Sequence, residues 1–523
     1  MSNDRSGRLL QHRLEVHDRK QLELKLELQP TGEAKRVRYW LELFFHVPGS
    51  LYINSETYPK ADVFAGVHNY VRLKTPNLSF QELLTSEASP LVGLERWAAG
   101  AGSATENEIV QRAKLLACVV RGALRRFASS ARTLGGRDRG TQDCPTALRN
   151  EADVARASMK ALLERYRTWM SLAELRLGDP RSRTALGLVD EYLSLSLEQF
   201  FRMVVARMEL LPHDDAWGEL RRGLLNSVLE EERYRVSLGL TSVLSLTGDN
   251  EEYMHRMGML KKFCMQALFL STHPTQTRAN VEELLLALAA GGAMMLATAI
   301  GLFAQVRFDQ LSSSFFFILI ASYMMKDRLK EALRRVAARV ATRHLFDRDA
   351  DVRLVSGGRD IARERDKVEY LSPAQVPDEL LLLRREDELV WATEGALSET
   401  VLRYQRELVA EVEDLPRWDD GPSGITDILR FSVDRFLRDM DEPEFALEYV
   451  DLEDFTVGHV RASKAYRVDL ACRITAEEGD RRETTIQAVR LVLDRNGIKR
   501  MDRLQSSSES VRVGAAAPVR AVA

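Results

Sequence analysis

The clearest metal-ligand spacing in the chain lies in the segment EEYMH, where Glu252 and His255 are three residues apart. A Glu-x-x-His pair on a helix places both side chains on one face, as in di-iron helical bundles. Such a centre needs a second pair and two further glutamates, and no second Glu-x-x-His occurs in the chain. Glu230, Glu231 and Glu232 could add carboxylates, but a run of charges on a helix is typical of a solvated face. The sequence therefore predicts no metal site.

A second set of candidate polar residues surrounds two histidines, His46 and His68. Four residues that could line a small polar site with them are near in sequence: Tyr58, Tyr70, Arg72 and Lys74. The alternative is that HNYVRLK forms the exposed side of a short helix over 61–73, since charge patterns of this kind mark solvated faces. We favour the exposed helix.

Motifs for phosphate binding and nucleophilic catalysis are missing from the sequence. The glycines of GAGSAT, at Gly100, lack the third glycine, preceding strand and lysine of a phosphate-binding loop, and no Walker or G-x-S-x-G sequence occurs. The cysteines are far apart and form no C-x-x-C pair: Cys118, Cys144, Cys264 and Cys472. This spacing favours reduced thiols over a disulfide framework or a zinc module. The sequence predicts no cofactor and no catalytic residues.

Composition indicates a large cytosol-facing protein of several units. With 523 residues, two to four domains are expected. The 74 Lys and Arg residues nearly balance the 77 Asp and Glu residues, which argues against nucleic acid as a partner. The N-terminal segment has no apolar core, so no cleaved signal peptide is expected.

The longest apolar segment, Leu284–Val306, contains no ionisable side chain. Its 23 residues would form about 35 Å of helix, enough to cross a hydrocarbon layer of about 30 Å. A second run, Leu311–Met325, reaches spanning length when it begins at Phe308, and the short connection predicts an antiparallel helical hairpin. The alternative for the second run is a re-entrant or interfacial helix.

Basic residues follow the second run and are expected to set the orientation of the hairpin. Seven of them lie in the next segment: Lys326, Arg328, Lys330, Arg334, Arg335, Arg339 and Arg343. Positively charged flanks stay on the cytoplasmic side, which predicts two spans of the cytoplasmic membrane with both termini cytoplasmic. The same residues would either bind anionic lipid headgroups or act only as a stop-transfer signal.

Small residues recur at every fourth position of the first span: Ala289, Ala293, Ala297 and Gly301. In lipid, such a face allows close approach of a second helix. The second helix is either the other half of the same hairpin or the hairpin of another copy, and the motif serves both uses equally.

The predicted fold class is an α+β membrane protein with a C-terminal antiparallel sheet. Alternating leucines predict a strand at 22–28, which we expect to form a hairpin with 37–45. The spacing of apolar residues predicts an amphipathic helix over 424–440, and Asn496-Gly497 predicts a hairpin turn. Six segments follow in chain order: an N-terminal α+β unit (1–104), a bundle of five long helices (105–280), a two-helix transmembrane hairpin (281–326), a basic juxtamembrane helix and linker (327–374), a C-terminal α+β domain (375–505) and a disordered tail (506–523).

Together these observations predict a membrane-anchored cytoplasmic scaffold, sensor or assembly protein without a catalytic site. Its expected partners are membrane lipids with anionic headgroups and other proteins or further copies of itself. One alternative is an oligomeric channel or pore-forming effector gated by the cytoplasmic domains. A second alternative is an enzyme whose site no motif marks.

Overall fold

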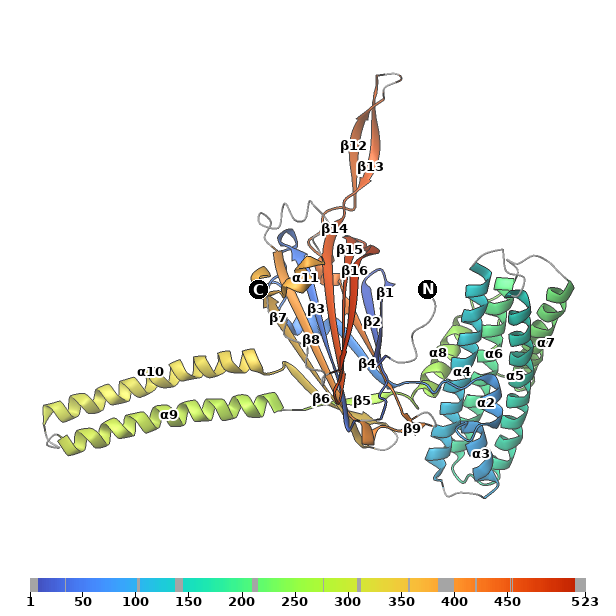
Figure 1. Cartoon of the computed structure of the whole chain (residues 1–523), viewed down its shortest axis with the longest axis horizontal. Helices are drawn as coiled ribbons and strands as arrows, with labels where there is room; N and C mark the ends of the chain where they lie inside the picture. The colour runs from blue at the N-terminus through green and yellow to red at the C-terminus, as the bar shows by residue number, and fades with distance from the viewer. Residues whose placement is uncertain are drawn as a thin grey trace, which may run out of the picture.

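The computed structural model describes residues 8–512 except for eleven short segments: 33, 101–103, 137–143, 209–214, 276, 308–311, 356–357, 384–398, 419–420, 452 and 454. The fold is mixed α+β with antiparallel sheets. A body of two sheets lies between a helical bundle on one side and a projecting pair of long helices on the other (Figure 1).

The larger sheet has eight strands, and every neighbouring pair is antiparallel. Its strands, in spatial order, are β16 (Gly497–Arg512), β15 (Arg481–Asp494), β14 (Tyr466–Glu478), β3 (Arg36–Pro48), β8 (Glu399–Glu411), β7 (Asp360–Leu371), β6 (Arg348–Leu354) and β5 (Leu270–Pro274). The turn between β15 and β16 contains Asn496-Gly497, as predicted. Gly497 has a positive φ of 130°, a conformation that glycine adopts readily because it has no Cβ.

The smaller sheet has four antiparallel strands and faces the larger one. Its strands, in spatial order, are β1 (Leu10–Asp18), β2 (Gln21–Leu28), β11 (Ile425–Ser432) and β4 (Val67–Leu73). Alternate residues of β2 are buried, which confirms the half-buried strand predicted at 22–28. The Phe45 ring of β3 stacks on the Phe431 ring of β11 with centroids 4.4 Å apart, so the core lies between the two sheets.

The prediction of separate N-terminal and C-terminal α+β units is wrong, because strands from both ends of the chain share both sheets. The expected hairpin of 22–28 with 37–45 does not form: β2 pairs with β1 and β11, whereas β3 pairs with β14 and β8. Strand β3 is apolar on its inner face and long enough to lie at the centre of the larger sheet. The strands of segments 1–104 and 375–505 therefore belong to one body.

Two predicted helices are strands in the structure. Segment 61–73 forms a short helix, α1 (Lys60–Ala65), followed by β4, and segment 424–440 forms β11 followed by one helical turn, α13 (Asp434–Leu437). In β11 the residues Ile425, Thr426 and Asp427 are all buried. A strand covered on both faces loses the two-residue alternation that would distinguish it from a helix.

Corrections also apply to the linker and the tail. The polar segment after residue 344, predicted as a linker to 374, forms β6 and β7, and residues 506–512 of the predicted disordered tail continue β16. Residues 513–523 lie outside the described part of the chain.

The helical bundle contains the five predicted long helices and has its own core. They are α4 (Glu106–Gly136), α5 (Cys144–Glu174), α6 (Pro180–Met208), α7 (Asp215–Ser237) and α8 (Glu251–Met265). Two short helices of the predicted N-terminal unit, α2 (Phe80–Thr85) and α3 (Pro90–Ala98), pack into the same core, so the bundle begins near residue 80 rather than 105. After α8 the chain returns to the larger sheet as β5, ahead of the predicted boundary at 280.

Two hairpins project from the sheet body (Figure 1). One consists of two long helices, α9 (Thr277–Arg307) and α10 (Ser313–His344), which lie side by side along their length. The other is a two-stranded ribbon, β12 (Glu444–Val450) and β13 (Val457–Ser463), that extends from the opposite part of the body.

Candidate functional site: the apolar helical hairpin

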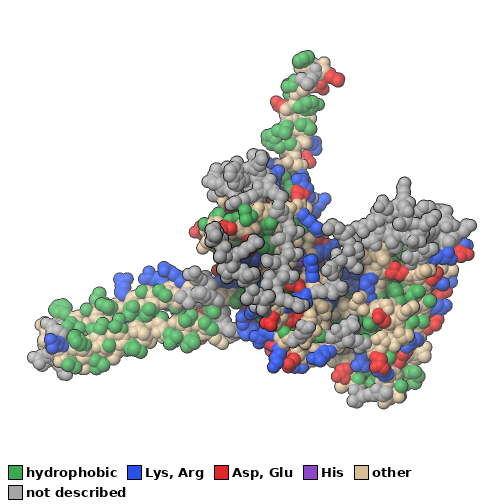
Figure 2. Space-filling view, viewed as in Figure 1, with side chains coloured by type: hydrophobic (Ala, Val, Ile, Leu, Met, Phe, Trp, Pro, Cys, Tyr) green, Lys and Arg blue, Asp and Glu red, His purple; other side chains and the backbone are tan. Residues whose placement is uncertain are grey.

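Helix α9 is the one helix among the described residues that is long and apolar enough to cross a membrane, over Ala279–Arg307. Almost none of this segment is buried, whereas a core helix of a soluble protein would be covered by its neighbours. Phe303 is 67 % exposed, and Leu284 and Met295 are similarly open. In Figure 2 hydrophobic side chains are spread over the visible surface of the hairpin from the body to the tip. An exposed apolar surface of this extent indicates a site for a membrane or another protein.

Helix α10 differs between its two halves. The half near the tip is apolar, with Phe317 73 % exposed, and the half near the body carries the basic residues. The Ser322 hydroxyl donates to the Ala297 carbonyl at 3.0 Å, which pairs the middle of α10 with the middle of α9. The apolar half of α10 therefore lies beside the second half of α9, and its basic half lies beside the first. The crossing of a membrane by the two helices stays a prediction.

The small-residue face of α9 is divided between two environments. Ala289 and Ala293 are buried, and the Ala293 side chain is only 1 % exposed, because α10 packs over them. Ala297 and Gly301 line a groove of about 330 Å³ that is bounded by both helices. A Cβ placed on Gly301 would meet no atom within 4 Å. The first half of the face therefore serves the hairpin itself, and the second half leaves room for another helix.

We expect Ala293→Leu to destabilise the hairpin by about 1–3 kcal/mol, because three added carbon atoms have no room between α9 and α10. The thermal unfolding of detergent-solubilised protein and the protease sensitivity of the interhelical loop would report the change. Thr298→Leu is the matched control, since Thr298 lies on the exposed side of the same helix. Equal stability of both variants would contradict this packing.

The basic residues predicted beside the membrane lie on the body-proximal half of α10. Five of them are exposed there: Arg328, Lys330, Arg334, Arg335 and Arg339. Lys326 is half-buried, with its ammonium 3.8 Å from the centre of the Tyr323 ring. The side chain of Arg343 lies outside the described residues. Figure 2 shows Lys and Arg side chains along the edge of this half of the hairpin.

The structure does not assemble the metal or histidine sites considered from the sequence. Glu252 and His255 are exposed on α8, and no group of three or more potential metal ligands occurs in the described part of the chain. His46 is buried in β3 of the larger sheet, whereas His68 lies on β4 of the smaller sheet. The segment around His68 is a strand and not the exposed helix that was predicted.

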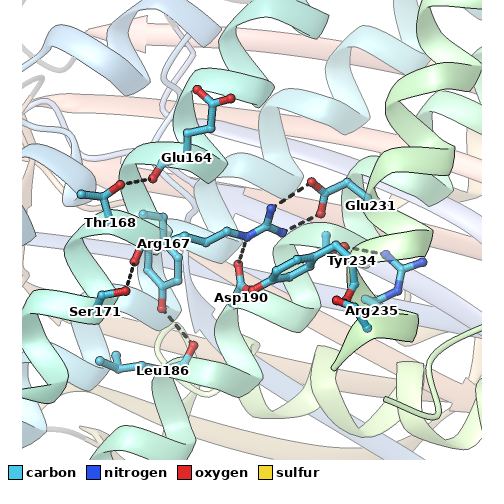
Figure 3. Close-up of polar contacts among 12 residues, drawn as sticks. Glu164, Arg167, Thr168, Ser171, Leu186, Asp190, Glu231, Tyr234 and Arg235 are labelled. Carbon is cyan, nitrogen blue, oxygen red and sulfur yellow. Dashed lines mark hydrogen bonds and ion pairs between the residues drawn. The ribbon is translucent and has the colours of Figure 1, made fainter. Parts of the chain in front are cut away.

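A buried ionic cluster in the bundle was missed, because one of its members belongs to a run of glutamates that was expected to face water. Figure 3 shows the Arg167 guanidinium between two carboxylates. It donates to Glu231 at 2.6 and 3.1 Å and to Asp190 at 3.0 Å, and the Tyr234 hydroxyl donates to Asp190 at 2.8 Å. Burial alone would lower the pKa of Arg167. The hydrogen bonds and negative charges of Glu231 and Asp190 have the larger combined effect, so the pKa of Arg167 is raised. Every charged member has a partner, so the cluster joins α5, α6 and α7.

A second buried cluster lies between the two sheets, around Arg406 of β8. This side chain is almost fully buried and donates to Glu364 at 2.5 Å, Asp366 at 2.9 Å and Asp427 at 2.6 Å. Burial raises the pKa of the Glu364 carboxyl. Burial alone would lower the pKa of Arg406, but the negative charges of the three carboxylates have the larger combined effect and raise it above the usual value. Because Asp427 comes from β11 and the other carboxylates from β7, the cluster connects the two sheets.

The larger sheet also carries a polar cleft of about 590 Å³ on its outer face. Trp40, Thr475 and Thr484 line it, but its charged groups are already paired: Arg473 contacts both Glu42 and Glu379. The Arg38 guanidinium lies 4.1 Å from the centre of the Trp40 ring and covers one of its faces. Among the described residues that line the cleft, no nucleophile is paired with a base.

Three of the thiols lie in the interior of the described part of the chain. Cys118, Cys264 and Cys472 are buried and free, and burial raises the pKa of Cys118 and Cys472 to about 12. A thiol with so high a pKa carries almost no thiolate at neutral pH and is a poor nucleophile.

Comparison with known proteins adds no functional assignment. No protein-family model matches the chain, and no curated protein sequence matches it significantly. The candidate site is therefore defined by the residues of the α9–α10 hairpin.

Proposed function

We propose that this chain is a membrane-anchored scaffold, sensor or assembly protein that holds its bundle and sheet body at the cytoplasmic face of a membrane. The observation that carries the proposal is the α9–α10 hairpin, which exposes a long apolar surface away from both folded parts. Leaving such a surface in water is unfavourable by roughly 25 cal/mol for each Å² of apolar area. Lipid acyl chains cover a surface of this length without requiring a shaped partner.

The way in which the hairpin joins the body supports a topology in which both ends of the hairpin lie on the same side of the membrane. Helix α9 follows β5 and α10 precedes β6, and these two strands are neighbours in the larger sheet. The Thr275 amide also donates to the Asp349 carbonyl at 2.8 Å, next to the two helix ends. A folded body that holds both ends so close together keeps both on one side of a bilayer. The basic half of α10 favours the cytoplasmic side.

The cost of burying charged side chains in hydrocarbon favours a hairpin that crosses the whole bilayer over one that enters only part of it. The apolar part of α10, Ser313–Met325, forms about 20 Å of helix, which is shorter than the hydrocarbon layer of about 30 Å. Lys326 and Arg328 follow at once, but long basic side chains near a boundary reach the headgroups, and the bilayer thins locally. Shallow insertion would instead place Arg307, at the end of α9, within hydrocarbon, where a charge costs about 2.5–3.5 kcal/mol. Crossing exposes Arg307 on the far side.

The scaffold role is supported by what surrounds the anchor. The described part of the chain has two large folded bodies, structural ion clusters and no nucleophile-base pair, and the exposed ribbon β12–β13 offers a further contact surface. We propose protein partners or further copies of the chain as its ligands, with anionic headgroups contacting the basic half of α10.

An oligomeric pore is the second candidate, and the open groove at Ala297 and Gly301 favours it. Small residues there would allow the hairpin of another copy to approach closely. The described part of α9 between Leu284 and Val306 has no ionisable side chain that would mark an ion path. We therefore rank the pore below the scaffold.

The topology is tested with single cysteine probes in intact cells. Arg307→Cys should react with a membrane-impermeant maleimide, whereas Lys160→Cys in the bundle should react only after the cells are made permeable. The three buried thiols give little background, and Cys144 is replaced by serine. Labelling of the probe at position 160 in intact cells, or protection of the probe at position 307, would overturn the proposed crossing.

A further inference from the structure

Four cations gather where the helical bundle meets the smaller sheet, and we name them the junction cluster. They come from three elements: Arg72 of β4, Arg121 and Arg125 of α4, and Lys261 of α8. None belongs to the hairpin or to the ionic clusters described above. Their positions follow from the backbone contacts that join these elements.

The chain after α8 is joined directly to β4. The Leu73 amide donates to the Leu268 carbonyl at 2.8 Å, and Arg72 forms a backbone bridge with Phe269. Lys261 lies two helical turns before Leu268, on the last part of α8. This connection places the last turns of α8 beside Arg72.

Helix α4 is joined to α8 at the same place. The Cys118 thiol donates to the Cys264 carbonyl at 3.4 Å, and Cys118 also packs into the core of the sheet body. Residues three and seven positions further along a helix lie on the same face, so Arg121 and Arg125 follow Cys118 on the side toward the junction. Three cation-bearing elements therefore converge.

The junction cluster lacks matching carboxylates. In the described part of the chain, no ion pair involves any of its four members, and the Arg72 Nε atom is buried without a hydrogen-bond acceptor. Glu27 is the carboxylate that interacts with Arg72, and it already pairs with Lys25 and lies 3.8 Å from Lys74.

The remaining contacts of the cluster are with neutral groups. Arg121 donates to the Tyr192 hydroxyl at 3.0 Å, which supplies no negative charge. Partial burial and then the positive charges of Arg121, Arg125, Arg72 and Arg430 lower the pKa of Lys261. Burial is also the main cause that lowers the pKa of Arg72. An anion at the junction would relieve both the repulsion and the missing acceptor.

We propose that the junction cluster binds a phosphate group. Guanidinium groups bind phosphate through two parallel hydrogen bonds, and a lysine adds a compact charge. A group with two negative charges suits four cations from three elements better than a single carboxylate does. The phosphate belongs either to a soluble compound or to a lipid headgroup. Since residues 268 and 269 lead directly into β5, the ligand would fasten the bundle to the strand that precedes the hairpin.

The test is a binding measurement on detergent-solubilised full-length protein. Pyrophosphate is titrated by calorimetry against sodium chloride of equal ionic strength, and dioctanoyl phosphatidic acid is titrated in parallel. We expect at least one of the two phosphate compounds to bind. Binding of pyrophosphate assigns the site to soluble phosphate compounds, and binding of the lipid alone assigns it to a headgroup.

Variants locate the binding. The double substitution Arg125→Gln with Lys261→Gln should weaken the affinity by about a hundredfold, since each charge-assisted contact contributes about a factor of ten. Both positions lie on helix surfaces, so the variant should fold, and Arg72→Met then tests the half-buried member. Lys160→Gln, an exposed cation on α5, is the matched control and should bind like the natural chain. Equal affinity in all variants, or no binding of either phosphate compound, would overturn the proposal.

Discussion

Replacing Arg406 by methionine is expected to lower the free energy of unfolding by about 3–5 kcal/mol, because it leaves buried carboxylates without their cation. Arg406 contacts Glu364, Asp366 and Asp427 at 2.5–2.9 Å in the natural chain. Methionine fills similar space but cannot neutralise or donate to any of them. Denaturant unfolding followed by tryptophan fluorescence would measure the loss.

The loss should depend on pH in a defined direction. A carboxyl group whose pKa is higher in the folded chain than in the unfolded chain takes up a proton on folding, and so it destabilises the fold as pH rises. Burial already raises the pKa of Glu364, and removal of the Arg406 charge would raise it further. The Arg406→Met variant should therefore be closer to the natural stability at pH 5 than at pH 8.

A surface ion pair on the neighbouring strand gives the control. Arg36 of β3 pairs with Glu411 of β8, but its side chain is 63 % exposed, so Arg36→Gln should change the stability by less than about 1 kcal/mol. Unchanged unfolding of Arg406→Met at pH 8 would show that the two sheets do not depend on the central cluster.

Removing the hairpin should convert the chain from a membrane protein to a soluble one. In the variant, residues 277–345 are replaced by a short Gly-Ser link between β5 and β6. These strands are antiparallel neighbours, with Pro274 opposite Ala350, so a short link can close them as a hairpin. The full chain should sediment with membranes through carbonate and high-salt washes, and the variant should remain in the supernatant.

Two controls make the result specific. Circular dichroism should show that the shortened variant keeps its bundle and sheets, and glutamine at Arg328, Lys330 and Arg334 of the full chain should leave its sedimentation unchanged. Release of the full chain by carbonate alone would contradict insertion and favour attachment through surface charge. Sedimentation of the folded, shortened variant would place the membrane contact elsewhere.

The sequence allowed the helices and several strands to be predicted, but not how the strands pair. Leu22 to Leu28 alternate so regularly that β2 follows from local pattern alone. The strands that pair with β2 could not be inferred, because strands pair through backbone N–H and C=O groups, which are the same in every strand. The nearest strand predicted from the sequence was β3, whereas the partners are β1, which was not predicted, and β11, near residue 428.

The candidate sites were predictable to different degrees. The apolar character of α9 follows directly from composition, since Leu284–Val306 contains no ionisable side chain. The ionic clusters and the junction cluster bring together residues that are distant in sequence, such as Arg72 and Lys261, and no local pattern marks them. One weak signal was present, since Asp427 and Thr426 interrupt the apolar pattern of β11 at positions that are buried.

The central place of β3 in the larger sheet also imposes an order on biosynthesis. On one side β3 pairs with β14, where His46 lies opposite Asp469, more than 400 residues later in the chain. At about 5–20 residues per second, the ribosome makes β14 roughly 20–85 s after β3. During that interval α9 and α10 are made before β8 and β14, so β3 still lacks both of its partners when the hairpin leaves the ribosome. If the hairpin inserts as proposed, the sheet is completed around an anchor already in the membrane, and the unpaired edges of β3 must be protected from aggregation until then.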